Sequence, residues 1–378
     1  MPLCIGVLKE TPDGEKRVAL VPADLKAIKA LGADVLIEAG AGTASSYPDA
    51  SYVAAGARVA NTREELLRSS QIVLFVSPQT GLAGPGKAEQ LFIGMGEALS
   101  KPGPHAALAK SGASTMALEL LPRITRAQSM DVLSSMATLL GYRGVLLAAD
   151  ALPRVFPLMM TAAGTLSPAR VLVMGVGVAG LSAIATAKRL GASVLAYDVR
   201  AAAKEQVASL GAKFLEIEVD SKEAEGTGGY AKAVSDEFLA KQRAAMLKAV
   251  ADSDVVITTA GVPGKKAPVL LTREMVEAMR PGSVVVDLMA ENGGNCELTK
   301  AGETVTVGAV TILGPRNVVS NLGAHASQMF SRNLLNFLKL IVKKGEMVLD
   351  TEDEIIRDVL VARGGEIVQP KVKEQIPT

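Results

Sequence analysis

Three glycines and one acidic residue form the pattern in this sequence that most clearly predicts chemistry. Gly175, Gly177 and Gly180 follow the spacing G-x-G-x-x-G between a short apolar run and a helical pattern. The first glycine of such a pattern permits a tight turn, the second lets the backbone approach a pyrophosphate, and the third lets the helix pack closely on the strand. Asp198 ends the next apolar run, where a carboxylate can accept hydrogen bonds from ribose hydroxyls. Together the four residues predict a binding site for NAD(H).

The residues around position 198 also bear on the choice between NAD and NADP. A carboxylate at this point repels a 2′-phosphate and therefore favours NAD. Arg200 lies two residues further on and has two interpretations: a cation that neutralises a phosphate, or an ordinary surface arginine. A Rossmann-type domain that no longer binds a nucleotide is the alternative to the whole prediction.

A second stretch with chemical potential is PRITRAQSMDVLSS, residues 122–135, which is unusually polar beside its apolar neighbours. Residues spaced three or four apart lie on one face of a helix. This spacing relates the polar residues of the stretch and of the helical pattern after it, namely Asp131, Ser134, Ser135, Thr138 and Tyr142. Such a face is directed either to a ligand or to solvent.

A structural interpretation of the same stretch is also open. Thr125 followed by Gln128 fits a capping box, in which each side chain satisfies a backbone N–H at the start of a helix. Asp131 would then lie in the first turn, where a negative charge suits the helix dipole. Spacing alone does not separate this interpretation from a binding site.

Two sets of strands and helices are needed to position these residues. Short apolar runs alternate with helical patterns from residue 3 to about 121 and again from residue 170, which indicates βαβ units. We therefore predict the α/β class, with two Rossmann-like domains that have parallel sheets, are joined by long helices and enclose a cleft. One of those helices would run from Thr125 to about Ala149.

The domain boundaries follow from the same pattern. We expect an N-terminal α/β domain, residues 1–138, completed by the C-terminal segment 320–378, and a Rossmann domain for NAD at 139–319. The returning segment begins with an amphipathic helix from about His325 and ends with a β-like tail at 355–370. A polar, glycine-rich stretch at 220–235 is either a solvated loop or a loop that closes over a ligand.

Composition excludes several classes of function. The chain has 378 residues and a net charge of +1, so no overall field attracts nucleic acid or an anionic membrane. Two cysteines, Cys4 and Cys296, cannot form a disulfide framework and lack metal-ligand spacing. No signal peptide is evident, and no run of about 18 uninterrupted apolar residues predicts a direct membrane span. We therefore expect a cytoplasmic chain.

Several motifs together resemble one known family, the NAD(H)-binding alpha subunit, or domain I, of proton-translocating nicotinamide nucleotide transhydrogenase. The resemblance covers nearly the whole chain. It is carried by EKRVALVP, PRITRAQSMDVLSSMATLLGYRG, TAAGTLSPARVLVMGVGVAG, GTGGYAKAVSDEF and PGSVVVDLMAENGGNCELT. The family is related to alanine dehydrogenase, so an NAD-dependent oxidoreductase of that kind is the alternative.

The resemblance implies catalytic roles for the polar stretch. In the family the corresponding loop places an arginine, a glutamine and an aspartate around the nicotinamide, which are Arg123, Gln128 and Asp131 here. The glutamine bridges toward the NADPH that a partner domain holds. Ser134 is a further catalytic contact and Tyr142 a contact to the cofactor.

The resemblance also completes the expected cofactor site. A mobile loop of the family closes on the nucleotide through a tyrosine, which corresponds to Tyr230, with Gly229 as part of its hinge. Val178 and Val199, which adjoin the second glycine and the acid, belong to the same set. Gly261 replaces an apolar residue that the family usually has in TTALIPG, and the segment 314–323 lacks the family's proline and arginine.

The alternative activity makes chemical demands that this chain does not meet in sequence. An alanine dehydrogenase deaminates an amino acid, which requires a general acid or base and a cation for the substrate carboxylate. By alignment, Phe75 and Gly96 stand where those relatives have a lysine and a histidine, and only Arg17 remains. Arg17 is either part of a substrate site or simply ion-paired. A third possibility is a module that senses NAD without transferring hydride.

The resemblance finally implies partners and a location. Only one dinucleotide fingerprint is present, so the NADP(H) site and the proton channel would lie on partner subunits, one of them membrane-spanning. A homodimer is expected. The chain would be attached peripherally, through those subunits, to the inner face of the cytoplasmic membrane.

Overall fold

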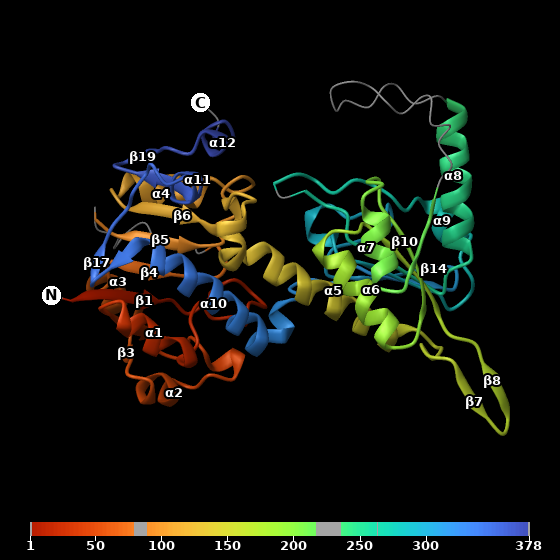
Figure 1. Ribbon diagram of the computed structural model, residues 1–378, viewed down its shortest axis with the longest axis horizontal. Coiled ribbons are helices and arrows are strands. Elements are labelled where there is room, and N and C mark those ends of the chain that lie inside the picture. Colours follow the sequence, from red (N-terminus) through yellow and green to blue (C-terminus); the bar gives the residue numbers. More distant parts are fainter. Residues whose placement is uncertain (1, 79–88, 217–235, 263, 377–378) are drawn as a thin grey trace. The chain divides into compact units, whose positions relative to one another are not determined.

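The computed structural model describes residues 2–78, 89–216, 236–262 and 264–376. The chain forms two compact units (Figure 1). The first, which we call the terminal unit, contains Met1–Met136 and Val319–Thr378, and the second, the central unit, contains Ala137–Val318. Each unit has a mainly parallel sheet flanked by helices, so the predicted α/β class is confirmed. Both sheets also have antiparallel strands at one edge, which the sequence analysis did not predict.

The terminal unit contains an eight-stranded sheet in the order β19-β18-β6-β5-β4-β1-β2-β3. Six of its strands are parallel, namely β1 (Leu3–Val7), β2 (Ala33–Glu38), β3 (Arg58–Ala60), β4 (Ile72–Leu74), β5 (Leu91–Gly94) and β6 (Ser114–Ala117). The C-terminal segment adds the antiparallel strands β18 (Leu360–Arg363) and β19 (Glu366–Ile367) beside β6. The order of the parallel strands reverses between β1 and β4.

Short helices and one long helix cover this sheet. The α-helices are α1 (Leu25–Ala30), α2 (Asp49–Ala54), α3 (Arg63–Ser69), α4 (Gly103–Lys110), α10 (Gly323–Ile341), α11 (Glu354–Val359) and α12 (Pro370–Lys373). The 3-10 helices are η1 (Pro22–Asp24), η2 (Thr43–Ser45), η3 (Leu118–Leu120), η4 (Thr125–Met130) and η6 (Ser320–Leu322), and β16 (Val342–Lys343) pairs with β17 (Glu346–Met347). The amphipathic helix expected from about His325 is confirmed as α10.

The predicted β-like tail is wrong where it begins. Residues 354–359 form α11, because the Asp353 carboxylate accepts a hydrogen bond from the Ile355 N–H (2.9 Å) and so caps the helix. The apolar run that follows then enters β18, as the tail prediction expects. An aspartate immediately before the run was the signal for a helix start.

The central unit has the strand order β11-β10-β9-β12-β13-β15-β14. Its strands are β9 (Arg170–Met174), β10 (Ser193–Tyr197), β11 (Lys213–Phe214), β12 (Val255–Thr258), β13 (Val284–Asp287), β14 (Thr304–Val307) and β15 (Val310–Leu313), with β14 antiparallel to β15. Its helices are α6 (Val178–Arg189), α7 (Ala203–Ser209), α8 (Asp236–Ala251), α9 (Arg273–Glu277) and the 3-10 turn η5 (Ala290–Asn292). The order of the strands reverses between β9 and β12.

Alternating residues of the central strands explain why both faces of this sheet are covered. Successive side chains of a strand point to opposite faces. Val171 and Val173 of β9 pack into one apolar cluster that includes Ile184 of α6, whereas Leu172 and Met174 pack into another. The second cluster contains residues of α8 and α9. Burial on both faces is typical of parallel sheets.

The helix predicted from Thr125 has a different start. Residues 125–130 form η4, and the regular helix α5 begins at Val132 and ends at Ala151. Among the described residues, α5 alone has the length and hydropathy of a membrane span. A search of the sequence for an uninterrupted apolar run does not find it. Val145 and Ala148 of α5 nevertheless lie in the core of the central unit, as in a helix of a folded domain.

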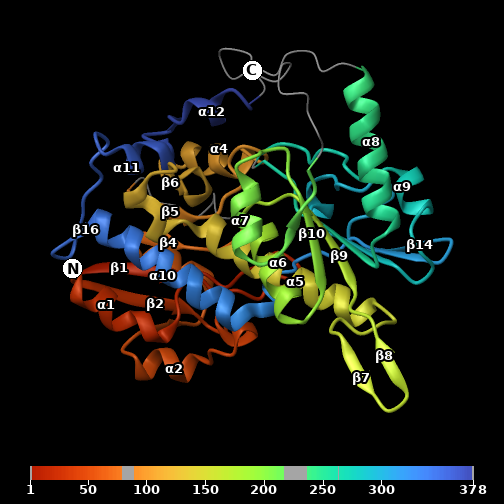
Figure 2. The same cartoon turned by 45° about the vertical axis from the view of Figure 1, so that its right-hand side comes forward.

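A hairpin that the sequence analysis missed extends from the central unit. It consists of β7 (Met159–Thr161) and β8 (Gly164–Leu166), and both views show it projecting away from the seven-stranded sheet (Figures 1 and 2). Met160 is 78% exposed and Leu166 is 51% exposed. A two-stranded hairpin with exposed apolar side chains is at best marginally stable by itself.

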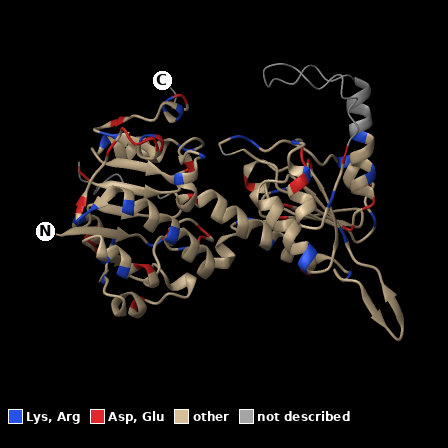
Figure 3. Cartoon of the chain, viewed as in Figure 1, with Lys and Arg blue, Asp and Glu red and all other residues tan. Residues whose placement is uncertain are grey.

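Charged residues are distributed over both units. Lys and Arg are interspersed with Asp and Glu in both units (Figure 3). This mixture accords with 40 basic and 39 acidic residues in the chain.

Candidate functional site

The glycine loop between β9 and α6 is closely packed at its first and third glycines and open at its second. Gly175 adopts φ +98°, and a side chain there would lie 2.9 Å from the backbone N of Ala260. A side chain at Gly180 would collide with the carbonyl oxygen of Gly175. At Gly177, the residue that precedes α6, a Cβ would meet nothing within 4 Å. The first and third glycines are therefore required by packing, and the second leaves space at the N-terminus of a helix, where an anion is favoured.

The acid at the end of β10 is tied to this loop. The Asp198 carboxylate accepts hydrogen bonds from the backbone N–H of Val176 (2.7 Å) and of Arg200 (2.9 Å). Burial works in the opposite direction, but these hydrogen bonds and the Arg200 side chain hold the pKa of Asp198 below its usual value. The carboxylate therefore stays ionised at neutral pH, which is the state that accepts ribose hydroxyls and repels a 2′-phosphate.

Arg200 makes several contacts with the acid and the glycine loop. Its guanidinium donates to both Asp198 oxygens (2.9 and 3.1 Å) and to the Val176 carbonyl oxygen (3.0 Å). Arg200 is thus an ion-paired side chain that braces the acid against the glycine loop. A ribose hydroxyl that binds Asp198 would compete with these donors, because a carboxylate has about four acceptor positions.

Two residues that the sequence analysis overlooked fix the loop after β12. The Asn295 side chain bonds both the backbone N–H (3.0 Å) and the carbonyl oxygen (2.8 Å) of Ala260. Thr259 donates its hydroxyl to the Gly175 carbonyl oxygen (2.9 Å), which joins this loop to the glycine loop. Asn295 in GGNCELT carries no local pattern that announces such a role.

Gly261, which stands where the family usually has an apolar residue, lies beside a methionine side chain. A Cβ at Gly261 would collide with the terminal methyl group of Met289, so this methionine occupies some of the space of the family's apolar residue. Met289 follows β13, whose last residue Asp287 is fully buried and accepts hydrogen bonds from Thr258, Met289, Asn295 and Cys296. Asp287 therefore organises loops and is not an available catalytic acid.

Three apolar or aromatic residues predicted to contact the cofactor are unusually exposed. Val199 is 82% exposed, and Tyr142 and Val178 are each 42% exposed. These side chains are accessible to a ligand, although single exposed apolar side chains are also common on protein surfaces. Gly229 and Tyr230, with the stretch 220–235, lie outside the described residues, and their predicted role stays a prediction.

In the terminal unit, the polar stretch is organised around Asp131. Its carboxylate accepts hydrogen bonds from the backbone N–H (2.9 Å) and the hydroxyl (2.6 Å) of Ser134, which caps the N-terminus of α5. The capping-box interpretation of Thr125 and Gln128 is wrong, because η4 has no side-chain cap. The 3-10 turn separates Thr125 from the helix that it was expected to begin.

Arg123 and Gln128 differ from these helix-capping residues. Both are exposed, and within the described ranges neither side chain has a hydrogen-bond partner. An exposed arginine just before η4 and an exposed amide within it are available to a ligand or a partner. Asp131 and Ser134 shape the segment instead, since their side chains bind each other.

The residues expected at a dehydrogenase substrate site form a closed cluster at the carboxyl ends of β1 and β4. The Arg17 guanidinium binds the Glu15 carboxylate through two donors (2.8 and 2.5 Å), so Arg17 is ion-paired, as one interpretation of the sequence proposed. Glu15 also accepts hydroxyl groups from Ser77 and Ser320, each at 2.6 Å. Burial alone would raise the pKa of Glu15, but Arg17 and these hydroxyls lower it to about 2.

A second buried carboxylate, Glu10, lies in this cluster. It accepts the backbone N–H groups of Val76 (2.7 Å) and Ser77 (3.0 Å). Burial outweighs these bonds and raises the pKa of Glu10 to about 8. At neutral pH Glu10 is therefore largely protonated, and Glu15 supplies the counter-charge to Arg17.

The positions of the missing lysine and histidine are filled. Phe75 is buried in the core of the terminal unit. A side chain at Gly96 would collide with the His105 imidazole, which is itself buried and bonded to Thr115 (3.0 Å) and to the Gly96 carbonyl oxygen (3.2 Å). Burial lowers the pKa of His105, so the ring is neutral and structural. A catalytic histidine at position 96 would not fit.

The remaining candidates for metal or redox chemistry are structural. Cys4 and Cys296 are free and buried, and burial raises the pKa of both thiols. Within the described ranges, no group of three or more His, Cys, Asp or Glu residues could hold a metal ion.

The altered segment 314–323 has Asn317 at φ +49°, with its backbone N–H donating to Glu291 (3.2 Å).

Comparison with known proteins agrees with this geometry. Residues 6–140 match the family model "Alanine dehydrogenase/PNT, N-terminal domain", and residues 144–370 match "Alanine dehydrogenase/PNT, C-terminal domain". The chain belongs to the alanine dehydrogenase/PNT family. The first match lies almost wholly in the terminal unit, whereas the second covers most of the central unit and continues into the returning C-terminal segment of the terminal unit.

Individual relatives place the chain among the transhydrogenase members of the family. It is 48% identical to an NAD(P) transhydrogenase alpha subunit chain of Rhodospirillum rubrum over 98% of this chain and 99% of that one. An alanine dehydrogenase of Mycolicibacterium smegmatis is 30% identical over 77% of this chain and 74% of that one. The crystal structure of a transhydrogenase from Sinorhizobium meliloti superimposes with a TM-score of 0.87 at 45% identity, covering 97% of this chain and all of that one.

Proposed function

We propose that this chain is the NAD(H)-binding component of a proton-translocating NAD(P) transhydrogenase. In this role it exchanges hydride with NADP(H) held on a partner subunit. The observation that carries the proposal is the contrast between the two units: the nucleotide loop is open at Gly177, whereas the amino-acid site is closed by Glu15 on Arg17. Membership of the transhydrogenase group supports the same assignment.

The residues fit the cofactor. Gly175, Gly177 and Gly180 would admit the pyrophosphate at the start of α6, and Asp198 would accept ribose hydroxyls. The exposed side chains of Tyr142, Val178 and Val199 would cover the apolar parts of the nucleotide, together with Gly261 and the loop of Gly229 and Tyr230. An ionised Asp198 favours NAD(H) over NADP(H) on this chain.

Hydride transfer between two nicotinamide rings requires the protein mainly to hold the rings in position. NADH, when bound, supplies a hydride from the nicotinamide ring. Arg123 would contact the nicotinamide end, and Gln128 would reach toward the nucleotide of the partner. Asp131 and Ser134 hold the start of α5 through their mutual hydrogen bonds (2.9 and 2.6 Å). No side chain has to take a proton from a reacting carbon, so the reaction needs no catalytic imidazole.

The alanine dehydrogenase alternative is disfavoured by the same contacts. Amino-acid oxidation needs a cation for the carboxylate and an acid or base at the amine. Arg17 is neutralised by Glu15, Phe75 is buried, and Gly96 has no room for a side chain. A sensor that only binds NAD is distinguished by experiment, because it would never transfer hydride with an NADP(H)-binding partner.

Substitution of Gln128 tests the proposal. Gln128→Asn should leave NADH affinity unchanged and slow hydride transfer once the NADP(H)-binding subunit is added, because the shorter amide cannot reach as far. Gln375→Asn, on an exposed residue near the C-terminus, is the matched control and should transfer at the normal rate. An unaltered rate for Gln128→Asn would exclude this role.

We also propose that the chain is a homodimer, attached to the inner face of the cytoplasmic membrane through its partner subunits. The exposed hairpin supports the dimer, since Leu158, Met160 and Leu166 offer apolar side chains beside unpaired strand edges. Met160→Glu should shift the chain to monomers in analytical ultracentrifugation. Val53→Glu, on an exposed valine of α2, is the control and should leave the dimer intact. A Met160→Glu dimer would contradict the assignment of this surface.

A further inference from the structure

The segment η4, which carries Gln128, has little internal support. It is a 3-10 helix of six residues, and 3-10 runs longer than three or four residues are uncommon because their hydrogen bonds are poorly aligned. No side chain caps its start. Its conformation must therefore be held by other elements, and two contacts from the C-terminal segment do so.

The first contact is an ion pair across 227 positions of sequence. Arg126 of η4 donates through both terminal nitrogens to the two carboxylate oxygens of Asp353, at 2.6 and 2.7 Å. The Asp353 side chain is only 15% exposed, and the hydrogen bond from Arg126 lowers its pKa. Because Asp353 also caps α11 through the Ile355 N–H, the arginine is attached to a fixed point. A two-point arginine–carboxylate pair fixes orientation as well as distance.

The second contact holds the other end of η4. The carbonyl oxygen of Ser129 accepts side-chain amide N–H groups from Asn333 (2.9 Å) and Asn336 (3.1 Å) of α10. Asn333 is buried, and its Oδ1 atom has no hydrogen-bond partner among the described residues. An unsatisfied buried oxygen is destabilising. The hydrogen bond from the Asn333 amide nitrogen to Ser129 explains why an asparagine is nevertheless present at this buried position.

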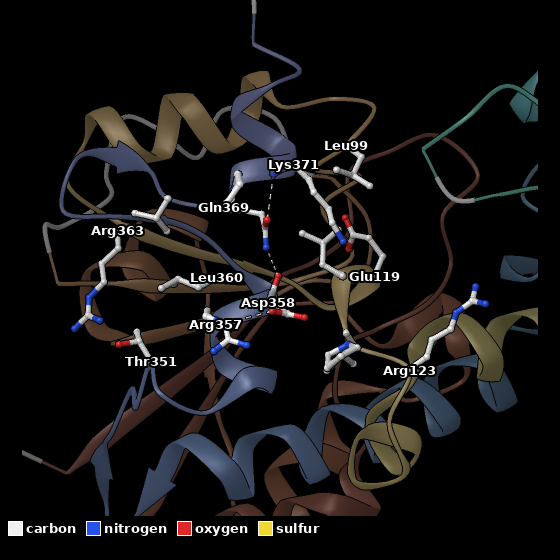
Figure 4. A pocket seen from close by; sticks show the side chains of 15 residues that line it. Leu99, Glu119, Arg123, Thr351, Arg357, Asp358, Leu360, Arg363, Gln369 and Lys371 are labelled. Atoms are coloured by element: carbon white, nitrogen blue, oxygen red, sulfur yellow. Dashed lines mark hydrogen bonds and ion pairs between the residues drawn. The ribbon is translucent and has the colours of Figure 1, made fainter. Parts of the chain in front are cut away.

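The residues just before η4 are not packed against the C-terminal segment. A cavity of about 750 Å³ separates Leu121, Pro122 and Arg123 from Thr351 and Asp358 (Figure 4). Arg123 points away from the other labelled side chains in this view. Since side chains do not fill this space, η4 is held by the polar contacts of Arg126 and Ser129 together with its buried side chains, Ala127 and Met130.

We infer that the C-terminal segment positions residues 123–131, which we call the hydride-transfer loop. Asp353 acts as a positioning residue through Arg126. Asn333 and Asn336 do so through Ser129. The inference rests on the proposed function, in which Gln128 lies between the two nucleotides. Gln128 is flanked by the two anchored residues, two positions after Arg126 and one before Ser129. Release of either anchor would let Gln128 move while the nucleotide loop of the central unit stays unchanged.

Asp353→Asn is the most direct test. Asparagine caps helices about as well as aspartate, so α11 should remain folded while the ion pair is lost. Displacements of about 1 Å far from the reacting atoms can slow a reaction about 100-fold, so we expect at least a roughly tenfold slower hydride transfer in single turnovers with the NADP(H)-binding subunit. NADH affinity, measured by the fluorescence of bound NADH, should be unchanged. A purely structural role would lower binding and melting temperature together.

Two further variants complete the design. Glu354→Gln removes the same charge one residue away, from an exposed side chain without a bond to the loop, and should transfer at the normal rate. Arg126→Gln breaks the pair from its other side, and the double variant with Asp353→Asn should be no slower than either single variant. Arg126→Gln also tests the inference if Asp353→Asn fails to fold.

The outcomes separate the inference from the proposed function. An active wild-type chain with normal rates in both single variants would overturn the inference and leave the proposed function intact. Losses that simply multiply in the double variant would also overturn it, because the two residues would then act independently. A wild-type chain that transfers no hydride with its partner would refute the proposed function, and the inference with it.

Discussion

The first five strands of each sheet, counted along the chain, are arranged in the same order, and the sheets differ in what lies where that order reverses. Between β9 and β12 of the central unit lie glycines, with open space at Gly177 and loops held by Asn295. Between β1 and β4 of the terminal unit lie Glu10 and the ion pair of Glu15 with Arg17. Ligands of open α/β sheets bind at such reversal points. Topology thus supplies two equivalent places, and the side chains decide which of them a ligand can enter.

The largest effect on NADH binding is expected at Gly177, where the central unit is open. Gly177→Val should weaken NADH binding about 100-fold or more, because it would displace the pyrophosphate from at least two charge-assisted hydrogen bonds, each worth about 1.5 to 3 kcal/mol. Stability should hardly change, since a Cβ there meets nothing within 4 Å. Gly103→Val, also in open space, is the control. Normal NADH titration of Gly177→Val would contradict the site.

The closed site of the terminal unit should be visible in the pH dependence of stability. The pKa of Glu10 is raised to about 8, from 4.5 for a solvated glutamate, so the folded chain keeps a proton that the unfolded chain releases. The free energy of unfolding should therefore fall as pH rises from about 4.5 to about 8 and level off above, by a few kcal/mol at most.

Glu10→Gln imitates the protonated acid and isolates this contribution. Its melting temperature should change less than that of the wild type between pH 4.5 and 8. Glu15, with its pKa lowered to about 2, contributes with the opposite sign, since its stabilisation is lost only as pH falls from 4.5 toward 2. Identical pH profiles of the wild type and Glu10→Gln between pH 4.5 and 8 would refute the assignment.

A smaller effect should follow from adding a side chain to the closed site. Gly96→Ala should lower the free energy of unfolding by about 1 to 3 kcal/mol, because the new methyl group meets the His105 ring. Combination with His105→Ala should recover some of this loss if the collision is the cause. Thermal denaturation of the three variants measures the coupling, and additive losses would show that the two residues do not compete for space.

How far the sequence predicts this molecule depends on how local each signal is. The glycine spacing and Asp198 are read within one βαβ unit, and the structure brings Asp198 to the glycine loop as that spacing requires. The start of α5 was misplaced because Thr125 and Gln128 satisfy a local capping pattern that the 3-10 turn replaces.

Other features have no local signal. The pair Arg126–Asp353 joins residues 227 positions apart, and the Met289 methyl group beside Gly261 comes from another strand end. The hairpin β7–β8 has no strong turn sequence, since TAAG lacks the Asn-Gly or Asp-Gly pairs of tight hairpins. Contacts between distant segments require the folded chain.

The smallest effect is expected from loss of the ion pair between Arg200 and Asp198. Arg200→Ala removes exposed donors, so NADH affinity should change by no more than about 1 kcal/mol. The freed, still ionised carboxylate should increase the preference for NADH over NADPH. Competition of NADPH against bound NADH measures this preference. A gain in NADPH binding would show that Arg200 is not needed to balance a 2′-phosphate and that Asp198 does not discriminate as described.

The central claim is that the open site of the central unit serves hydride exchange with a second nucleotide, while the closed site of the terminal unit no longer handles an amino acid. Both reactions can be measured on one preparation. With an added NADP(H)-binding subunit, the purified chain should catalyse reduction of an NAD analogue by NADPH, and without it the chain should not oxidise NADH in the presence of pyruvate and ammonia. Oxidation of NADH by pyruvate and ammonia, with no transfer from NADPH in the presence of the partner, would contradict the account.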